Sequence, residues 1–322
     1  MYIEAFYEVH ASRTDTIPNN DLTKEILSRK TEENSSEIDA FLENFKSILS
    51  FAYRLLYKNL NKTDKILFVD FLLKRFANVD TITNPEQQFL DKVFDMTYQL
   101  YQSRGNKNAP VKVCVENGTA NLLSKTPIYE SKPEKEQELM SYYEYVHTYV
   151  LREYHLKDFE PIDGQAILDC GASIGDTAIY FKLVYPKSPV YAIECDDENY
   201  EYLNTNMELN NFENVATIKT FLSDTDDDNQ ITIDELVKQV NIENIGLIKF
   251  DIEGEERKAL KGAINTIRTQ KPILIIPIYH LSDDCYQIPK FLKSLNMPMQ
   301  FRLKWVEKRV WGMDCTLFVK FL

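Results

Sequence analysis

The chain has 322 residues, 44% of them hydrophobic and 27% charged, the composition of an ordinary globular protein long enough for two domains. Its 37 basic and 50 acidic side chains give a net charge of −13 at pH 7. This charge disfavours broad binding to nucleic acids or anionic membrane surfaces, because both present negative charge.

Cysteine usage and the absence of long apolar runs narrow the class further. The five cysteines are scattered without a CxxC pair, which predicts neither a zinc knuckle nor a disulfide framework and favours a reducing, cytoplasmic compartment. No apolar run is long enough to span a bilayer. The first residues carry acids rather than a basic n-region, so we predict no secretory signal and no membrane span.

The N-terminal part is predicted to be helical. Apolar side chains recur at three- and four-residue spacing over 37–60, 64–77 and 85–103, as in amphipathic helices. Asp64 is predicted to cap the second helix, and Pro85 to occupy the first turn of the third. The apolar stripes favour a helical core. The alternative is a docking surface, including a homo-oligomer formed through this domain.

A change of pattern follows these helices. Residues 111–115 alternate and Asn117-Gly118 favours a tight turn, which together predict a β-hairpin. Residues 124–138 are polar and contain prolines, as linkers do, and 139–156 form a Tyr-rich helical pattern. We therefore predict three parts: a helical N-terminal domain at 1–108, a hairpin and linker at 109–138, and an α/β domain at 139–322.

Strand and helix patterns alternate through the third part, which predicts a parallel sheet with helices on both faces. The expected strands are 165–169, 189–194, 215–221, 246–251 and 272–279. The expected helices are 176–185, 197–210, 234–240, 255–269 and 284–295. Two further strands, 299–305 and 315–321, are predicted to close the domain as an antiparallel pair.

The stretch from Ala166 to Thr177 organises this domain. An apolar strand ends at Asp169, the chain turns through Gly171 and Gly175, and a helix follows. Glycine allows the sharp turn and the close approach of a ligand to the backbone. In open α/β sheets, ligands bind beyond the carboxyl ends of the strands, so the residues there define the ligand class.

Acids close nearly every predicted strand. A dinucleotide site requires a GxGxxG turn and a helix N-terminus that faces the pyrophosphate. Here Asp169 replaces the first glycine, and Asp176 is the first residue of the helix. A cationic, hydroxyl-rich cofactor such as S-adenosylmethionine fits better, with Glu194 accepting the ribose hydroxyls. Taken singly, each acid could equally be a helix cap or a solvated strand end. Their joint placement favours nucleoside binding.

Five blocks resemble the FkbM family of S-adenosylmethionine-dependent methyltransferases, over residues of about 152–320. They are Arg152–Tyr154, Ile167–Thr177, Val190–Glu194, Ile248–Glu255 and Ile278–His280. The resemblance implies a Rossmann-like, seven-stranded class I methyltransferase sheet that ends in an antiparallel hairpin. It also implies O-methylation, often of a sugar hydroxyl, so the expected partner is a small-molecule or glycan acceptor. The expected cofactor-binding residues are Asp169, Gly171, Ala172, Ser173, Gly175, Asp176, Thr177, Glu194, Cys195, Asn199, Ser223, Asp224 and Asp251.

Two residues depart from the family pattern. Cys195 stands where the family usually has proline, just after the acid expected at the ribose. Pro277 falls inside the fifth predicted strand, where it removes a ladder donor. That strand is therefore expected to end early or to bulge just before His280.

The candidate catalytic residues follow the fourth and fifth strands. His280 is the expected general base, because imidazole titrates near neutral pH; the alternative is a structural core histidine. Asp251 and Glu253 could orient His280, hold sugar hydroxyls or, with His280, bind a divalent cation, which we do not favour. Lys249 shares a strand face with Asp251 and is expected to pair with an acid of the site.

A different function is suggested by residues 224–235. Asp224, Asp226, Asp228 and Glu235 fill positions one, three, five and twelve of an EF-hand calcium loop. An EF-hand needs a helix before the loop, but the preceding residues have a strand pattern. A calcium-binding module, or a non-catalytic methyltransferase-fold scaffold, are thus the alternatives to an enzyme.

Overall fold

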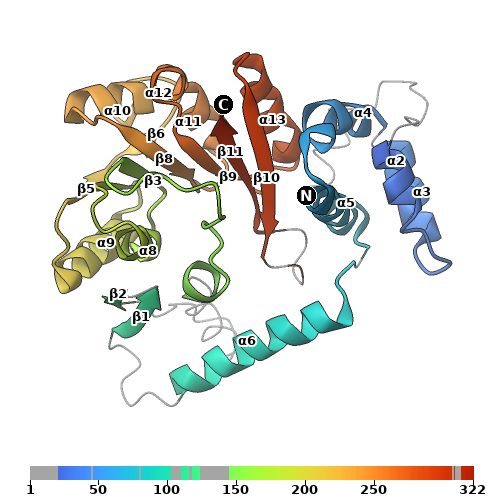
Figure 1. Cartoon of the computed structure of the whole chain (residues 1–322), viewed down its shortest axis with the longest axis horizontal. Coiled ribbons are helices and arrows are strands. Elements are labelled where there is room, and N and C mark those ends of the chain that lie inside the picture. The colour runs from blue at the N-terminus through green and yellow to red at the C-terminus, as the bar shows by residue number, and fades with distance from the viewer. Residues whose placement is uncertain are drawn as a thin grey trace. The chain divides into compact units, whose positions relative to one another are not determined.

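The computed structural model describes residues 21–44, 46–79, 81–102, 110–115, 118–123, 145–306, 308 and 313–322 (Figure 1). Contacts divide the chain into two compact units, one of Met1–Gln87 with Pro277–Leu322 and one of Gln88–Ile276. The linker expected at 124–138 lies outside the described residues, as does the start of the Tyr-rich helix. The boundaries expected at 108 and 138 therefore stay predictions. No helix in the described ranges is both long and apolar enough to cross a membrane.

The first unit is mostly helical, as predicted. Its elements are α2 (Asp21–Leu27), α3 (Ser35–Asn44), α4 (Lys46–Leu55), the 3₁₀ turn η1 (Tyr57–Asn59), α5 (Lys62–Ala77), α13 (Asp284–Ser294), β10 (Met299–Trp305) and β11 (Cys315–Phe321). The range expected as one helix, 37–60, thus holds most of α3, all of α4 and η1. β10 and β11 pair antiparallel, from Met299 opposite Phe321 to Trp305 opposite Cys315, which confirms the expected hairpin.

The prediction that Asp64 caps α5 was wrong. The cap is Asn61, whose side chain accepts a hydrogen bond from the backbone N–H of Asp64. The Asp64 carboxylate is 1% exposed and instead accepts hydrogen bonds from Arg302 Nε at 2.6 Å and from the Leu303 N–H at 3.1 Å. It ties α5 to β10, and this use of the side chain depends on residues more than 230 positions away.

The second unit contains the predicted β-hairpin. Helix α6 (Asn84–Gln102) leads into it, and β1 (Val111–Val115) pairs antiparallel with β2 (Gly118–Leu122). Two asparagines of α9 (Asp197–Asn210) bond the backbone of β2 and the residue after it. The Asn210 amide bonds both the N–H and the carbonyl oxygen of Asn121, each at 2.7 Å. Asn206 bonds the same two groups of Leu123, at 2.7 and 2.9 Å, and donates to the Ile174 carbonyl.

The rest of the second unit has the predicted α/β alternation. Its elements are β3 (Ala166–Cys170), α8 (Asp176–Val184), β4 (Val190–Glu194), α9, β5 (Val215–Lys219), β6 (Phe221–Leu222), β7 (Gln230–Ile231), α10 (Ile233–Val240), β8 (Ile245–Phe250), α11 (Glu256–Lys261), α12 (Ile264–Gln270) and β9 (Ile273–Pro277). Figure 1 shows α8 and α9 on one side of these strands and α10 to α12 on the other.

The seven-stranded sheet has the order β10-β11-β9-β8-β3-β4-β5. Neighbours from β9 through to β5 run parallel. β3, β8 and β9 consist entirely of buried residues, as the central strands of a parallel sheet covered on both faces should. The expected fold class is therefore confirmed: α/β, with an antiparallel hairpin at one end of the sheet and a helical N-terminal region.

Three elements of the α/β part also differ from their predicted bounds. The helix expected at 255–269 is two helices, α11 and α12, separated at Gly262 and Ala263. The Gly262 carbonyl accepts the Asp234 N–H at 2.8 Å, and the Asp234 carboxylate accepts the N–H groups of Asn265 and Thr266 at the start of α12. The third strand stops at Lys219, and the short β6 that follows pairs with β7. The fifth strand ends at Pro277, as the missing ladder donor predicts.

Candidate functional site

A buried ion-paired cluster joins the ends of β3 and β8. The Lys249 ammonium on β8 lies 3.1 Å from Asp169 Oδ1 on β3 and 3.8 Å from Asp251 Oδ2. It also donates a 2.8 Å hydrogen bond to the Gly171 carbonyl oxygen. The side chains of Lys249 and Asp169 are 1% and 0% exposed, whereas that of Asp251 is 23% exposed. The ion pair expected for Lys249 is thus present.

Charge balance in this cluster favours a cationic ligand. Burial acts to lower the pKa of Lys249, but Asp169 and Asp251 outweigh burial and raise that pKa above its usual range. The ammonium therefore stays protonated, and Thr177 Oγ1 donates a 2.6 Å hydrogen bond to Asp169 Oδ2. Burial raises the pKa of Asp169, against the lowering effects of Lys249 and Thr177. The cluster holds two carboxylates and one ammonium, so with both acids ionised it carries a net negative charge, part of it on the half-buried Asp251.

The glycine turn brings the end of β3 against the end of β8. Gly171 and Gly175 have left-handed backbone conformations, with φ of +77° and +90°. A Cβ on Gly171 would lie 1.7 Å from the Asp251 carbonyl oxygen, so no larger residue fits there. The N–H groups of Gly171 and Ala172 both donate to the Ile193 carbonyl at 2.9 Å, which ties the turn to β4.

Glu194 closes β4 and sits against this turn. Its carboxylate is largely buried: Oε2 accepts the Ser173 N–H at 2.8 Å, and Oε1 accepts the N–H groups of Cys195 and Asp196, each at 2.9 Å. A carboxylate offers about four acceptor positions, so capacity remains for a hydroxyl donor. Asp196 then caps α9 by accepting the Asn199 N–H at 2.8 Å.

Residues 145–154 contribute groups that were not among the predicted site residues. The Tyr154 hydroxyl donates a 2.7 Å hydrogen bond to Asp251 Oδ2, and Lys249 Nζ lies 5.0 Å from the centre of the Tyr154 ring. In the π-helical turn η2 (Tyr145–Val150), Thr148 Oγ1 donates to Asp176 Oδ2 at 2.6 Å. Tyr154 lies in the first block that resembles the family, which is the one signal that marks it in the sequence. Nothing comparable marks Thr148.

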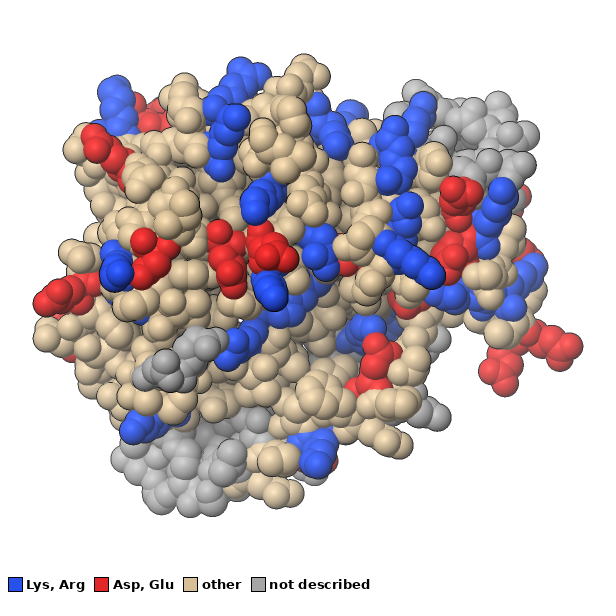
Figure 2. Space-filling model, viewed as in Figure 1, with Lys and Arg blue, Asp and Glu red and all other residues tan. Residues whose placement is uncertain are grey.

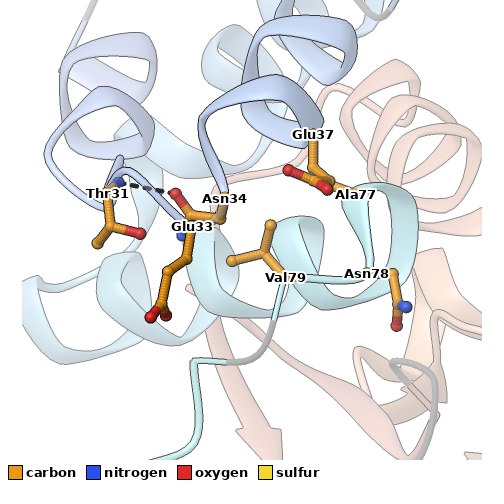
Figure 3. A pocket seen from close by; sticks show the side chains of 7 residues that line it. All are labelled: Thr31, Glu33, Asn34, Glu37, Ala77, Asn78 and Val79. Carbon is orange, nitrogen blue, oxygen red and sulfur yellow. Dashed lines mark hydrogen bonds between the residues drawn. The ribbon is translucent and has the colours of Figure 1, made fainter.

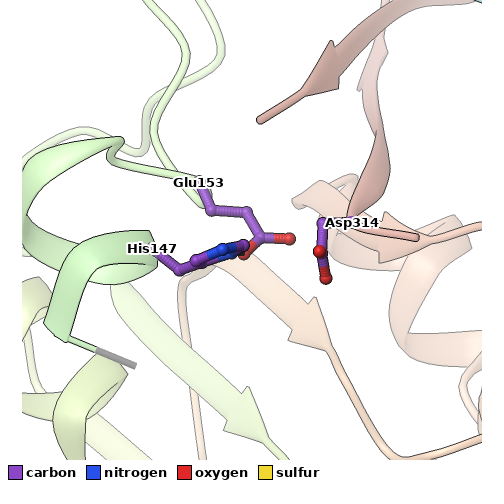
Figure 4. A group of neighbouring side chains, drawn as sticks. All are labelled: His147, Glu153 and Asp314. Atoms are coloured by element: carbon purple, nitrogen blue, oxygen red, sulfur yellow. Dashed lines mark hydrogen bonds and ion pairs between the residues drawn. The ribbon is translucent and has the colours of Figure 1, made fainter. Parts of the chain in front are cut away.

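A buried histidine–carboxylate pair holds this segment in shape (Figure 4). His147 Nδ1 lies 3.1 Å from Glu153 Oε2, with the two side chains 4% and 3% exposed. The Glu153 N–H also donates to the His147 carbonyl at 2.9 Å. The pair closes the loop between η2 and Tyr154, and so fixes the residue that bonds Asp251.

The remaining candidate residues lie in several places. Ser223 is buried and its N–H bonds the Ile231 carbonyl at 3.0 Å, while the exposed Asp224 lies 3.5 Å from Lys261. Glu253 is exposed in a left-handed conformation, with φ of +54°. His280 follows β9 and belongs to the first unit, where its ring centre lies 4.4 Å from that of Tyr279. Together in the second unit stand Asp169, Gly171, Thr177, Lys249 and Asp251.

The loop that matches a calcium motif does not have EF-hand surroundings. The strand β6, not a helix, precedes residues 224–235, as the strand pattern predicted. Within the loop, Asp226 Oδ1 accepts the Thr232 N–H at 2.6 Å, and Glu235 is bonded to Lys238 and Gln239 at 3.1 Å. These carboxylates therefore stabilise the turn and the start of α10.

A pocket in the first unit is separate from these residues (Figure 3). It lies between the start of α3 and the end of α5, and is bordered by Asn34, Glu37 and Asn78. The side chain of Asn34 accepts the Thr31 N–H at 2.7 Å on its rim. None of the candidate cofactor or catalytic residues lines this pocket.

A glycine turn after the first strand of a seven-stranded sheet, with acids at the strand ends, defines the Rossmann-like class I methyltransferase fold. Residues 210–297 match the family model of the Methyltransferase FkbM domain. Residues 210–297 therefore resemble the Methyltransferase FkbM domain. No curated protein matches it in sequence.

Solved structures are similar to this chain at low sequence identity. The methyltransferase FkbM of Methylobacillus flagellatus KT has a TM-score of 0.57 and 18% identity, covering 88% of this chain and 61% of its own. This chain therefore spans less than two thirds of that protein. Precorrin-6y C5,15-methyltransferase of Geobacter metallireducens GS-15 has a TM-score of 0.39 and 12% identity, over 55% and 87% of the two chains. Aeropyrum pernix fibrillarin, whose structure contains natively bound S-adenosyl-L-methionine, has a TM-score of 0.37 and 14% identity. The match covers 49% of this chain and 66% of that chain.

Proposed function

We propose that the chain is an S-adenosylmethionine-dependent O-methyltransferase whose acceptor is a hydroxyl of a sugar or glycan-like molecule. The observation that carries the proposal is the Glu194 carboxylate at the end of β4, held against the glycine turn by the Ser173 N–H at 2.8 Å. The family match at 210–297 and the acids after β3 and β8 support it independently.

The residues present suit this cofactor. Glu194 would accept the ribose hydroxyls, and the net negative cluster at Asp169, Lys249 and Asp251 would favour the cationic amino acid end. Ser223 and Asp224, which follow β6, would lie at the base. When bound, the cofactor supplies a methyl group activated by a sulfonium.

On the acceptor side, we assign the role of general base to His280, which would take the proton of the acceptor hydroxyl. Asp251 and Glu253 would hold or orient the acceptor. The assignment depends on residue type and chain position, since an imidazole titrates near neutral pH.

Calorimetry with S-adenosylhomocysteine tests the cofactor site. We expect micromolar binding to the wild-type chain and a loss of affinity of about tenfold or more in Glu194→Gln, because one acceptor oxygen of a buried carboxylate is lost. Glu201→Gln, on the exposed face of α9, is the matched control and should bind normally. Wild-type protein that binds no S-adenosylhomocysteine would refute the proposal.

A transfer assay tests the acceptor. Radiolabelled methyl groups from S-adenosylmethionine should appear on a hydroxyl-rich glycan and survive alkali, because methyl ethers are stable where carboxyl methyl esters hydrolyse. His280→Gln should slow this transfer while leaving S-adenosylhomocysteine affinity unchanged. Alkali-labile label would instead assign the transfer to a carboxylate acceptor.

A further inference from the structure

Five lysines on neighbouring elements of the first unit make no ion pair with an acid within the described part of the chain. They are Lys58 in η1, Lys62 and Lys65 in α5, and Lys290 and Lys293 in α13. The elements are in mutual contact, since α4 packs on both η1 and α13, and α5 packs on η1. We call these five side chains the lysine surface. Figure 2 shows basic side chains gathered over α13, α4 and α5.

The lysine surface is built on buried rings. Lys65 Nζ lies 5.2 Å from the centre of the Tyr57 ring, Lys290 Nζ 5.3 Å from that of Tyr286, and Lys293 Nζ 4.8 Å from that of Phe301. These rings are 4%, 6% and 1% exposed. The lysine stems therefore cover core rings, an arrangement in which the charged ends stay in water.

Two pairs of these lysines lie close to one another. Lys290 and Lys293 are three residues apart on α13 and so share a helix face. Burial, and then the nearby charge of Lys58, lower the pKa of Lys293. The nearby acids include Asp21 and Glu25 of α2, which act on Tyr57, and the buried Asp64 of α5, which is bonded to Arg302. Elsewhere the pattern differs: Lys238, Lys258 and Lys261 of the second unit pair with Glu235, Glu255 and Asp224.

We propose that the lysine surface binds an acidic glycan, a carbohydrate chain that carries carboxylate or phosphate groups. Unneutralised positive charge on a chain of net charge −13 draws anionic groups to that place, over roughly the 8–10 Å of the Debye length. A flexible oligosaccharide can reach a local cluster, whereas a bilayer or a long duplex also meets the negative remainder of the surface. The rings beneath the lysines are buried, so none is presented for insertion into lipid.

The inference rests on the proposed function in naming a glycan, and adds that the glycan is acidic. The test uses the full chain with a fluorescent decamer of polygalacturonate, and a neutral dextran decamer as its counterpart. Binding is measured by fluorescence anisotropy at low and high salt. The variant is Lys58→Gln/Lys290→Gln/Lys293→Gln, and the control Lys238→Gln/Lys258→Gln/Lys261→Gln changes the net charge equally.

We expect the polygalacturonate decamer to bind the wild-type chain and the control equally, more weakly at high salt, and about tenfold or more weakly to the lysine-surface variant. Neutral dextran should not bind. Equal loss in both triple variants, or equal binding of dextran, would overturn the inference. So would binding to vesicles of phosphatidylserine and phosphatidylcholine with none to polygalacturonate.

Two further measurements distinguish a loss of glycan binding from a loss of folding or of cofactor binding. Circular dichroism melting checks that the triple variant folds, and the milder Lys58→Gln/Lys290→Gln replaces it if it does not. Calorimetry with S-adenosylhomocysteine on the same samples separates the two proposals. Lysine-dependent binding of polygalacturonate without cofactor binding would support the lysine surface as a glycan site and refute the methyltransferase function. Cofactor binding without lysine-dependent binding of polygalacturonate would support the methyltransferase function and refute the glycan site.

Discussion

The Tyr154 hydroxyl donates a 2.7 Å hydrogen bond to the Asp251 carboxylate, although the two residues lie 97 positions apart. The same carboxylate oxygen lies 3.8 Å from the buried Lys249 ammonium, which in turn lies 5.0 Å from the centre of the Tyr154 ring. Tyrosine, lysine and aspartate thus constrain one another at the end of β8. The orientation of Asp251 depends on a residue outside the strand that carries it.

Tyr154→Phe keeps the ring beside Lys249 and removes only the hydroxyl. We expect it to cost about 1.5–3 kcal/mol of folding stability, the contribution of one hydrogen bond to a charged group, and to lower affinity for S-adenosylhomocysteine several-fold. Urea unfolding and calorimetry measure the two effects. Tyr200→Phe is the control, because the Tyr200 hydroxyl lies 3.4 Å from its partner atoms on Thr217, so the hydrogen bond that this variant loses is long and weak. Equal losses in both variants would deny Tyr154 its orienting role.

Lys249→Met should destabilise the fold by about 3–5 kcal/mol, because it leaves the buried Asp169 carboxylate without its cation. The double variant Asp169→Asn/Lys249→Met removes both charges and should recover much of that loss. Urea unfolding of the two single variants and the double variant forms a cycle that isolates the pair. Additive losses would show that the two residues act independently despite the 3.1 Å separation.

Gly171→Ala and Gly164→Ala separate backbone strain from steric overlap. Both positions have positive φ, +77° and +106°. A Cβ meets nothing within 4 Å at Gly164, but at Gly171 it would lie 1.7 Å from the Asp251 carbonyl oxygen. We expect about 1 kcal/mol of destabilisation at Gly164 and several kcal/mol at Gly171, from thermal unfolding. Similar losses of stability in the two variants would show that close packing is not the reason why residue 171 must be glycine.

Stability at acid pH should depend on Glu86. Burial acts to raise the pKa of Glu86, but hydrogen bonds from Lys308 and Thr83 outweigh it and lower that pKa from about 4.5 to about 2. A depressed pKa means that stability is present above about pH 4.5 and is lost as the pH falls toward 2. The melting temperature of Glu86→Gln should therefore lie below that of wild type at neutral pH and converge on it over this window. The melting temperature of the control Glu33→Gln, at an exposed residue, should follow that of wild type over the same pH range.

Much of the fold and of the site was predictable, because the residues that determine each of these features lie close together in the sequence. The acids Asp169, Glu194 and Asp251 follow apolar runs that could only be buried strands, and β9 ends at Pro277 because proline has no ladder donor. Lys249 shares a strand face with the residue it approaches, so its ion pair was expected. In each case the information lies within a few residues of the feature.

Features that depend on distant partners were not predictable. Asp64 has the residue type and position of a helix cap, and no nearby residue indicates its partner Arg302. The start of α12 after Gly262 depends on hydrogen bonds to the distant Asp234. Tyr154 and Thr148 donate to Asp251 and Asp176, which lie 97 and 28 positions away, and no spacing in the sequence indicates these partners. These are tertiary contacts, and they override local propensity.

The asparagines on α9 have a consequence for how the molecule behaves in a crowded solution. An edge strand ordinarily offers unpaired N–H and C=O groups that can recruit a strand from another molecule and seed aggregates. Asn210 and Asn206 bond both backbone groups of Asn121 and Leu123, just as a neighbouring strand would. Side-chain amides thus block intermolecular pairing along that edge of β2, and replacing both with alanine would leave it open to self-association.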